Sequence, residues 1–413
     1  RFMTSIESGT SFDPRSLLLS LFKQGLDAVN GRATVRAWLE IHSLHTPFHL
    51  VALGKAAEAM AAGALEAAGS ELAAGLVVTR RGYLETPVQR DPRLVTLEAG
   101  HPLPDEQSLA AGRALELFLD SAPADASFLF LVSGGTSSLV EAPVAGVSLR
   151  DLQQLNLWLL GSGLPISDIN RVRAALSRIK GGRLAEHLKG RKATLLLMSD
   201  VPGDVMSDIG SGLLLPGEAK PIPGFPPGFA SLPFQTDTAQ PCENVEAYIV
   251  ASNRLAREAV AKQARDRGFG AVMHADLPSG DAASCGEAIA RDLLQAPGGV
   301  IHIWGGETTV RLPEQPGQGG RNQHLALAAA RVLAGHGDVF LLSAGTDGSD
   351  GNSDDAGALV DSGTVERGDV AGYDALDCLE RADAGTFLEA SGDLVCTGPT
   401  GTNVMDLMIG LKK

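Results

Sequence analysis

Arg321 stands in the glycine-rich stretch 317–323 (GQGGRNQ) and is the first candidate for chemistry in this chain. The apolar run 299–304 before it is typical of a buried strand, and the Ala- and Leu-rich run 324–333 after it is typical of a helix. Arg321 is therefore expected where a helix begins, whereas residues 305–308 (GGET) are explained nearly as well by a turn stabilised by Thr hydroxyls. A guanidinium beside the backbone N–H groups of a helix N-terminus can bind phosphate or carboxylate. The alternative is a solvated arginine on a flexible loop.

Two further loops follow apolar runs and carry small or hydroxyl-bearing residues. Lys55 comes directly after the run 49–53, among small neighbours that allow a ligand to come close. The second loop follows the run 128–132 and consists of Ser133, Gly134, Gly135, Thr136 and Ser137. Its backbone N–H groups and hydroxyls can cradle phosphate oxygens. The alternatives are a solvated lysine at a helix start and an ordinary tight turn.

Two carboxylates stand at other predicted strand ends. Asp200 follows the run 193–198, and Asp347 lies in the glycine-rich segment 343–351. A carboxylate in such a place can hold Mg²⁺ or accept a proton. An Asx turn, in which the side chain bonds the backbone of its own loop, is the alternative.

Residues 397–403 are expected to lead from the last strand into a terminal helix. Thr400 and Thr402 would then lie near the helix N-terminus, where they either cap the helix or bind phosphate. Asn403 closes the same segment.

A dense basic cluster occupies segments 170–173 and 177–183 of this acidic chain, and the second segment contains Lys180, Gly181 and Gly182. Such a cluster can offset the charge of an anionic cosubstrate. The alternative is a solvated helix face.

The apolar runs that precede these loops alternate with helical patterns. Strands are predicted at 49–53, 75–79, 128–132, 193–198, 247–250, 300–304, 339–342 and 394–396, and helices at 14–40, 56–68, 254–267 and 324–333. This alternation predicts an α/β fold with mostly parallel sheets. The carboxyl ends of parallel strands converge, so the polar loops are expected to face a common site.

The segment 215–241 is rich in proline and glycine and is the expected linker between two domains. It separates an N-terminal domain, 1–236, from a C-terminal domain, 237–413. Each is large enough for a core of its own. We therefore predict two α/β domains with an active-site cleft between them.

The composition narrows the class of function. The chain has 413 residues, of which 44% are hydrophobic, and a net charge of -15, which argues against nucleic-acid binding. Four scattered cysteines form no cluster with metal spacing, so structural zinc is not expected. No run approaches the roughly 18 uncharged residues of a membrane span, and the start lacks a signal-peptide core. We expect a cytoplasmic protein.

Several common motifs are missing. There is no GxxxxGK[ST] phosphate loop, and no GxGxxG stands between a strand and a helix for a dinucleotide. The GxSxG elbow of serine hydrolases is also missing. Any nucleotide must therefore be bound by another kind of loop.

Taken in their order, these loops resemble those of the glycerate 2-kinase family, whose C-terminal half is the MOFRL domain. The marks are ALGKA at 52–56, GHPLPD at 100–105, SGGTS at 133–137, IKGGRL at 179–184, MSDVPGD at 198–204, the stretch 305–323, GTDG at 345–348 and GPTGTN at 398–403. The chain departs from the family at 211–215 (SGLLL), where Ser-Gly-Pro-Thr is usual.

The resemblance implies phosphorylation of D-glycerate at its 2-hydroxyl by ATP with Mg²⁺, giving 2-phosphoglycerate and ADP. It implies a Rossmann-like, DUF4147-like N-terminal domain and a MOFRL-like C-terminal domain. It also implies that Lys55 and Arg321 are the leading active-site residues, one from each half. Phosphoryl transfer needs mainly positioning and neutralisation of charge, which Lys, Arg and a metal supply.

We expect Lys55 and Arg321 to bracket the glycerate carboxylate and the transferring phosphoryl group. Asp200 and Asp347 are expected to bind Mg²⁺ or to accept the hydroxyl proton, and the residues alone do not divide these roles. The nucleotide is expected to contact the loop 133–137 together with Lys180, Gly181, Gly182, Thr400 and Asn403.

Two other functions fit the same residues. The first is an NAD(P)H-dependent hydroxypyruvate reductase, against which the missing dinucleotide glycines weigh. The second is a non-catalytic protein that binds small anions. In each case the expected partners are small molecules rather than nucleic acid or membrane, and the expected assembly is a monomer or homodimer.

Overall fold

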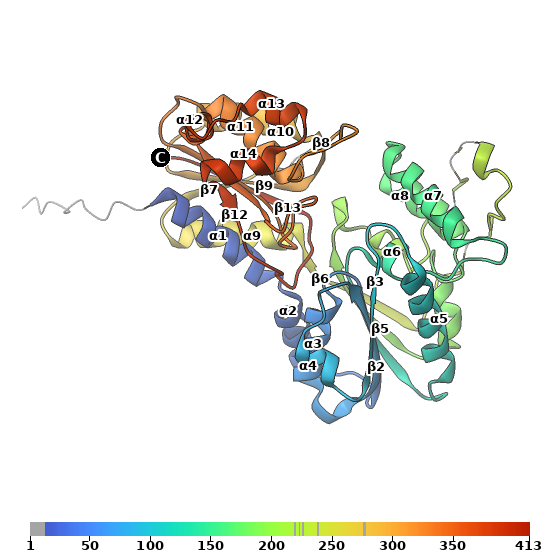
Figure 1. Ribbon diagram of the computed structural model, residues 1–413. Coiled ribbons are helices and arrows are strands. Elements are labelled where there is room, and N and C mark those ends of the chain that lie inside the picture. The colour runs from blue at the N-terminus through green and yellow to red at the C-terminus, as the bar shows by residue number, and fades with distance from the viewer. Residues whose placement is uncertain (1–12, 219, 223, 225–226, 238, 276–277) are drawn as a thin grey trace, which may run out of the picture. The chain divides into compact units, whose positions relative to one another are not determined.

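The structure is a computed structural model that describes residues 13–413 except 219, 223, 225–226, 238 and 276–277 (Figure 1). The chain forms two compact units. The parallel-sheet unit consists of Leu26–Ala256 and Pro399–Met405, and the mixed-sheet unit of residues 13–25, Arg257–Gly398 and Asp406–Lys413. The backbone therefore passes between the units after residues 25, 256, 398 and 405.

The parallel-sheet unit is built on six parallel strands in the order β3-β2-β1-β4-β5-β6. The strands are β1 (Phe48–Leu53), β2 (Leu72–Arg80), β3 (Leu94–Ala99), β4 (Ser127–Val132), β5 (Ala193–Ser199) and β6 (Val245–Ser252). This is the strand order of Rossmann folds. The prediction of a parallel, Rossmann-like sheet is confirmed for this unit.

Helices cover both faces of this sheet, as a parallel sheet requires. Figure 1 shows α2, α3 and α4 on one face and α5 on the other. The apolar side of α5 packs against strand residues such as Phe130 and Val132. The helices of the unit are α2 (Gly31–Ile41), α3 (Ala57–Ala68), α4 (Thr86–Arg90), α5 (Glu106–Ser121), α6 (Thr136–Leu139), α7 (Leu149–Gly161) and α8 (Ile166–Ala175).

The proline-rich segment 215–241 is part of this unit, although its composition predicted a linker between domains. It packs on α7 and α8, where Ile222 and Phe234 lie against a small apolar core that includes Leu159 and Val172. Among its described residues, regular secondary structure is limited to one short 3-10 helix, Pro227–Phe229, but its proline content does not prevent packing. The linker prediction is therefore wrong.

The mixed-sheet unit contains a seven-stranded sheet in which β12, β11, β10, β13, β9 and β7 follow one another and β8 pairs with β9. Only β7 and β8 run parallel to β9, and the other neighbours are antiparallel. Here the structure differs from the mostly parallel sheet expected. The strands are β7 (Gly270–Met273), β8 (Ser279–Asp281), β9 (Val300–Thr309), β10 (Val339–Gly345), β11 (Gly357–Asp361), β12 (Leu394–Val395) and β13 (Asp406–Lys412).

Strand β13 replaces the terminal helix that was predicted after residue 403. It lies between β10 and β9, and its side chains from Asp406 to Leu411 are buried. A short apolar run fits a buried strand and a helix equally well, so periodicity alone could not decide. Strand β9 also continues through residues 305–308, where Gly306 pairs with Asp406. Residues 305–308 therefore belong to a strand and do not form the turn that was one alternative for them.

The division between the units also differs from the predicted one after residue 236. Strand β6 pairs with β5, and the parallel-sheet unit therefore continues to Ala256. The predicted helical segment 14–40 is two helices, α1 (Pro14–Ala28) and α2, and the Asn30 side chain caps α2 by accepting a hydrogen bond from Ala33 N. Most of α1 belongs to the mixed-sheet unit, where Arg15 bonds to Asp393 at 2.8 Å.

Figure 1 shows α10 to α14 on one side of the mixed sheet and α1 with α9 on the other. The helices are α9 (Asn253–Asp266), α10 (Ala282–Gln295), α11 (Arg321–Leu333), α12 (Thr364–Val370), α13 (Ala375–Glu380) and α14 (Ala384–Ser391). None of the helices in the described ranges is long and apolar enough to cross a membrane.

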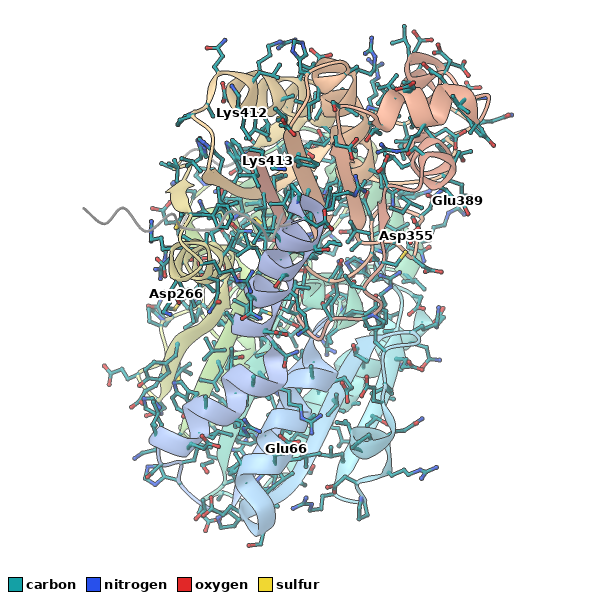
Figure 2. The ribbon with its side chains drawn as sticks, turned by 90° about the vertical axis from the view of Figure 1, so that its left-hand side faces the viewer. Glu66, Asp266, Asp355, Glu389, Lys412 and Lys413 are labelled. Atoms are coloured by element: carbon teal, nitrogen blue, oxygen red, sulfur yellow. The ribbon has the colours of Figure 1, made fainter. Side chains whose placement is uncertain are left out.

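Acidic side chains carry the negative charge mainly on the surface. In Figure 2, Asp266 and Glu66 lie at the outside of their own units. Each is paired with a base of its own unit, Asp266 with Lys262 at 2.6 Å and Glu66 with Arg32. Such exposed pairs are screened by water and add little stability.

Candidate active site

The parallel-sheet unit places two predicted loops at the point where its strand order reverses. Connections from β1 run towards β2 and β3, whereas those from β4 run towards β5 and β6. In open α/β sheets, ligands bind at the carboxyl ends of the strands beside this switch point. Lys55 follows β1 and the loop 133–137 follows β4. These two of the predicted loops therefore lie side by side, whereas Asp347 and Arg321 belong to the other unit.

The two loops bond to each other through their backbones and through Ser133. Lys55 N donates to Gly134 O at 2.9 Å, and Ala56 N donates to Ser133 Oγ at 3.0 Å. Gly54 has a φ of 118°, and a Cβ there would lie 2.2 Å from Ser133 Oγ. Because Ser133 is completely buried, its hydroxyl holds the two loops together rather than facing solvent.

The side chains of Lys55, His101, Asp200 and Asn403 gather around the two glycines of the second loop. A Cβ on Gly134 would lie 1.8 Å from Asp200 Oδ2 and 2.2 Å from Asn403 Nδ2. A Cβ on the next glycine, residue 135, would lie 3.1 Å from both Lys55 Cγ and His101 Cδ2. Because glycine has no side chain, the backbone of residues 134 and 135 can lie close to the Asp200 carboxylate, the Asn403 amide and the Lys55 side chain.

His101 was quoted only as part of a motif and not as a site residue. It comes two residues after β3, and this strand was not predicted because Thr96 and Glu98 interrupt its apolar pattern. The position of His101 after a strand end was the signal that could have found it.

The other residues of the loop bond inside the protein. Thr136 Oγ1 donates to Ser133 O at 2.7 Å and is buried. Ser137 Oγ lies 2.7 Å from Ser211 Oγ. These bonds fix the shape of the loop, so the groups that it offers to a ligand are chiefly its backbone N–H groups.

Lys180 is buried beneath this loop rather than exposed beside it. Its Nζ contacts the Glu141 carboxylate and donates to Ser137 O at 2.8 Å. Burial lowers the pKa of Lys180 below its ordinary value, although Glu141 opposes the shift. The structure thus gives Lys180 a supporting position, which differs from the nucleotide contact expected. Gly182 bonds to Gly212 O through its N–H in a tight turn.

Asn403 reaches Asp200 from the short segment Pro399–Met405. Its Nδ2 donates to Asp200 Oδ2 at 3.3 Å, and its backbone N–H lies 3.1 Å from Met198 Sδ. Thr400 was expected at a helix N-terminus, but the segment leads into β13. Thr400 Oγ1 instead accepts a hydrogen bond from Thr402 N at 3.4 Å.

The mixed-sheet unit carries the second cluster, which is centred on Arg321. Arg321 is the first residue of α11, as predicted. Its Nε and Nη2 donate to the buried Asp406 carboxylate at 2.6 and 2.9 Å, and its Nη1 lies 2.9 Å from Glu307 Oε1. Although burial opposes the charge, these carboxylates raise the pKa of Arg321 above its ordinary value. Arg321 is therefore a fixed cation held by a bidentate pair.

The N–H groups at the start of α11 are already bonded to a carboxylate. Asp350 accepts hydrogen bonds from Asn322 N at 3.1 Å and Gln323 N at 2.8 Å. The expectation that these N–H groups await an anionic ligand is therefore wrong, because the protein supplies the anion. Sequence reasoning missed Asp350, whose contact spans 28 residues of chain.

Burial raises the pKa of Asp350 to about 6, and Asp406 adds to the shift, while the N–H bonds oppose it. Because the folded pKa lies above the unfolded one, ionisation between about pH 4 and 6 should cost the folded state roughly 3 kcal/mol. We expect Asp350→Asn to remove this cost. The thermal midpoint of the variant, relative to wild type, should rise by several degrees between pH 4 and 7. Parallel curves over that range would contradict the shift.

Asp347 lies at the end of β10 and bonds within its own turn. Its Oδ1 accepts hydrogen bonds from Ser349 N at 3.2 Å and Ser349 Oγ at 3.3 Å. A Cβ on Gly345 would lie 3.4 Å from Asp347 Oδ1 and 3.6 Å from Asp406 Oδ1, so this turn adjoins the Arg321 cluster.

The two expected metal ligands, Asp200 and Asp347, belong to different units. Within the described ranges, no three or more His, Cys, Asp or Glu side chains are grouped as a metal site. Magnesium often takes only one or two protein carboxylates and completes its shell with water and phosphate oxygens. Asp200, beside the loop of Gly134, offers one such carboxylate.

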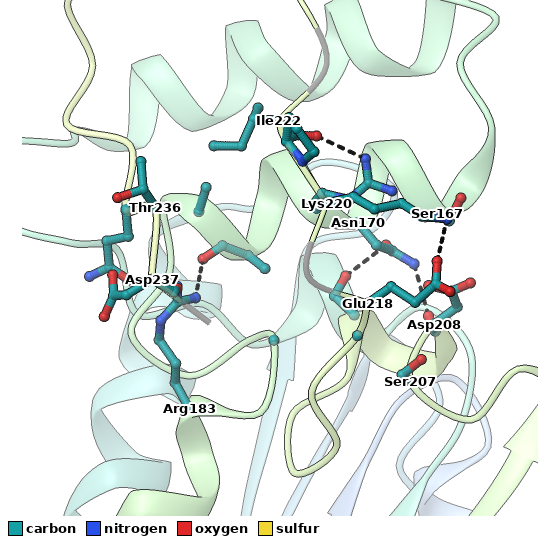
Figure 3. A pocket seen from close by; sticks show the side chains of 18 of the residues that line it. Ser167, Asn170, Arg183, Ser207, Asp208, Glu218, Lys220, Ile222, Thr236 and Asp237 are labelled. Carbon is teal, nitrogen blue, oxygen red and sulfur yellow. Dashed lines mark hydrogen bonds and ion pairs between the residues drawn. The ribbon is translucent and has the colours of Figure 1, made fainter. Parts of the chain in front are cut away.

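A cavity of about 580 Å³ lies in the parallel-sheet unit beside α8 (Figure 3). Its walls come from α8, from the turn Ile209–Ser211 and from the proline-rich segment. In Figure 3, Thr236 and Asp237 lie on one side of it and Asn170 and Asp208 on the other. Its size is that of a small-molecule site. Of the residues named from the sequence, Gly181 lines it together with Asn170, Arg171 and Arg183 of the basic cluster.

Comparisons with known proteins agree with these features. Residues 17–221 match a domain of unknown function, DUF4147, and residues 300–406 match the MOFRL family. The D-glycerate 2-kinase of Thermotoga maritima is 37% identical over 97% of this chain and 99% of its own length. A protein of Agrobacterium vitis, provisionally named a hydroxypyruvate reductase, is 36% identical over 87% of this chain and 97% of its own.

A solved structure agrees over the same extent. The crystal structure of a glycerate kinase from Thermotoga maritima superimposes with a TM-score of 0.84 and 35% identity, covering 97% of this chain and 99% of that one. The likeness therefore extends over both units.

Proposed function

We propose, from the premise that this chain belongs to the glycerate 2-kinase family, that it transfers the terminal phosphoryl group of ATP to the 2-hydroxyl of D-glycerate. The products are 2-phosphoglycerate and ADP. The observation that carries the proposal is the gathering of Lys55, Asp200 and Asn403 around Gly134 at the switch point of the parallel sheet.

Lys55 and Arg321 supply the positive charge that phosphoryl transfer needs. The charge on a transferring phosphoryl group is spread over its oxygens, and catalysis consists mainly of positioning and neutralisation. The Lys55 side chain lies close to the backbone of Gly135, and this close approach depends on the absence of a side chain at residue 135. Asp406 holds the Arg321 guanidinium in one orientation. The Nη1 atom lies against the half-exposed Glu307, and we propose that a ligand approaches from this side. We propose that both cations act on glycerate and the phosphoryl group.

The Gly134-Gly135 backbone fits the phosphate chain of a nucleotide, since no side chain projects from it into the space near Lys55. Mg²⁺, when bound, neutralises charge on the phosphate oxygens. We propose that Asp200 contributes to holding it and that Asn403 orients the Asp200 carboxylate through the 3.3 Å hydrogen bond.

The same observations distinguish Asp200 from Asp347. We expect Asp200→Asn to lower kcat by about 10² or more, in the range of a lost base or metal ligand. Asp347→Asn should have a smaller effect, because Asn can keep the bond from Ser349 N that forms the turn. Steady-state rates at several Mg²⁺ concentrations give the measurement. A ligand role raises the Mg²⁺ concentration needed for half-maximal rate, and a base role does not. A near-normal rate for Asp200→Asn would remove it from the mechanism.

One comparison tests the reaction itself. The protein is given D-glycerate with ATP, and ADP release is followed; in parallel it is given hydroxypyruvate with NADH or NADPH, and loss of absorbance is followed. We expect ADP release alone. Binding of glycerate without turnover in either tube would instead support a non-catalytic anion-binding protein.

The reductase is the second candidate because a relative carries that provisional name and because the strand order is that of dinucleotide-binding sheets. The turn after β1 reads Gly54-Lys55-Ala56-Ala57, with a lysine and no second glycine where GxGxxG would approach a pyrophosphate. This turn supports the kinase over the reductase.

A further inference from the structure

The cavity beside α8 has no part in the mechanism above, and its walls combine apolar and polar groups. Five apolar residues line it, from α8 and from the loops opposite: Ala174, Ala175, Val205, Pro221 and Ile222. Hydroxyl and amide groups lie between them: Asn170, Ser207, Ser211, Gln235 and Thr236. Sites with mostly apolar walls and a few placed polar groups are typical of small-molecule pockets.

The charges of the cavity cancel, which argues against a phosphate at its centre. Its three cations, Arg171, Arg183 and Lys220, are matched in number by three carboxylates, Asp208, Glu218 and Asp237. Two of the cations already have partners, because Lys220 contacts Glu218 and Arg171 lies 2.9 Å from the carboxylate of Asp168, which lies outside the lining. A cavity without surplus positive charge suits an uncharged group that forms hydrogen bonds.

The two arginines hold the walls together instead of pointing at a ligand. Arg171 Nη1 donates to Pro221 O at 3.1 Å. Arg183 donates to Ala174 O at 2.7 Å and to Asp237 O at 2.8 Å. Gln235 N donates to Ala175 O at 2.8 Å. These bonds fasten the proline-rich segment to α8, so the cavity is a built feature of the fold.

Gln235 supplies a buried hydrogen-bond acceptor. Its Oε1 is buried, and no group within the described ranges donates a hydrogen bond to it. A buried acceptor without a partner costs about 1–3 kcal/mol. The Gln235 side chain lines the cavity, so rotation of its amide would bring Oε1 from this buried position to a ligand that carries an amine or hydroxyl group, as adenine and ribose do.

One wall of the cavity is bonded directly to the glycine-rich loop. Ser211 lines the cavity, accepts a hydrogen bond from Gly181 N through its backbone carbonyl, and lies 2.7 Å from Ser137 Oγ through its hydroxyl. The same hydroxyl bonds to Asn170 Oδ1 at 2.9 Å. The cavity therefore adjoins the loop whose backbone suits phosphate.

We propose that this cavity binds the nucleoside part of the phosphoryl donor and directs its phosphates to Gly134 and Gly135. The inference rests on the proposed use of a nucleoside triphosphate and adds where the base and ribose lie. It gives the proline-rich segment 215–241 a role as a wall of the nucleotide site.

Filling the cavity tests the proposal. Ala174→Phe places a ring among the lining residues, and Ala67→Phe, on the exposed side of α3, is the matched control. The probes are ADP and inorganic triphosphate, which has no nucleoside, and binding is measured by calorimetry. We expect Ala174→Phe to weaken ADP binding by about tenfold or more, while triphosphate binding stays as in wild type. Ala67→Phe should change neither.

A second variant guards against a folding defect in the first. Gln235→Leu removes the buried acceptor at similar volume and should weaken ADP binding without changing triphosphate binding. Unchanged ADP binding in both variants, or equal weakening of ADP and triphosphate, would overturn the cavity assignment and leave the kinase proposal standing. A wild-type protein that neither binds ADP nor releases it from ATP overturns the proposed function itself.

Discussion

Arg321→Ala should lower kcat by about 10³, because removing an arginine that meets charge developing on a phosphoryl group costs roughly 10³ to 10⁵. The structure adds a second effect. Asp406 is buried and bonded to Arg321 through both oxygens, so the variant removes the arginine partner of a carboxylate inside the mixed-sheet unit. Breaking a buried pair in this way costs roughly 3 to 5 kcal/mol of stability.

A double variant separates the two effects. Arg321→Ala with Asp406→Asn removes both charges and should regain much of the lost thermal stability. If Arg321 acts on the phosphoryl group, kcat stays low in the double variant although the fold is restored. Recovery of most of the activity would show that Arg321 serves the fold alone.

Lys55→Met is expected to lower kcat/KM by about 10² to 10³, the usual effect of removing one donor from a site where charge develops. Methionine keeps the length of the side chain and removes its charge. Because the turn that carries Lys55 is fixed by Gly54 and Ser133 rather than by the lysine, the backbone should stay in place. Steady-state kinetics with D-glycerate and ATP give the measurement.

The control for Lys55 is another lysine of the same unit. Lys189 is exposed and paired with Asp120 at 2.8 Å, and it comes before β5, whereas the loops of the site follow the ends of their strands. Lys189→Met should leave the kinetics near wild type. A loss of less than about tenfold in Lys55→Met would be too small for the proposed role.

Strand ends and helix starts could be predicted from the sequence because they depend on local patterns. Lys55 was found after the run 49–53, and Arg321 was found before an Ala- and Leu-rich helix. These are the features that periodicity and glycine placement determine. The parallel-sheet architecture followed from the same alternation of elements.

The partners of those residues could not be predicted, because they come from distant parts of the chain. Asp406 lies 85 residues after Arg321, in a strand that was predicted as a helix. Asp350 occupies the start of α11 through tertiary contacts. The proline content of segment 215–241 suits both a linker between domains and a cavity wall held by Arg171 and Arg183. Composition alone therefore could not distinguish the two.

The segment Pro399–Met405 limits how this protein can be divided. It returns to the parallel-sheet unit from the C-terminal part of the chain, where Gly31 N donates to Gly401 O at 2.9 Å and Asn253 Nδ2 donates to Val404 O. A gene fragment that stops at residue 256 would therefore encode Asp200 without Asn403. The two units cannot be exchanged between relatives by a single cut, and a chimera must carry this short segment together with the N-terminal piece.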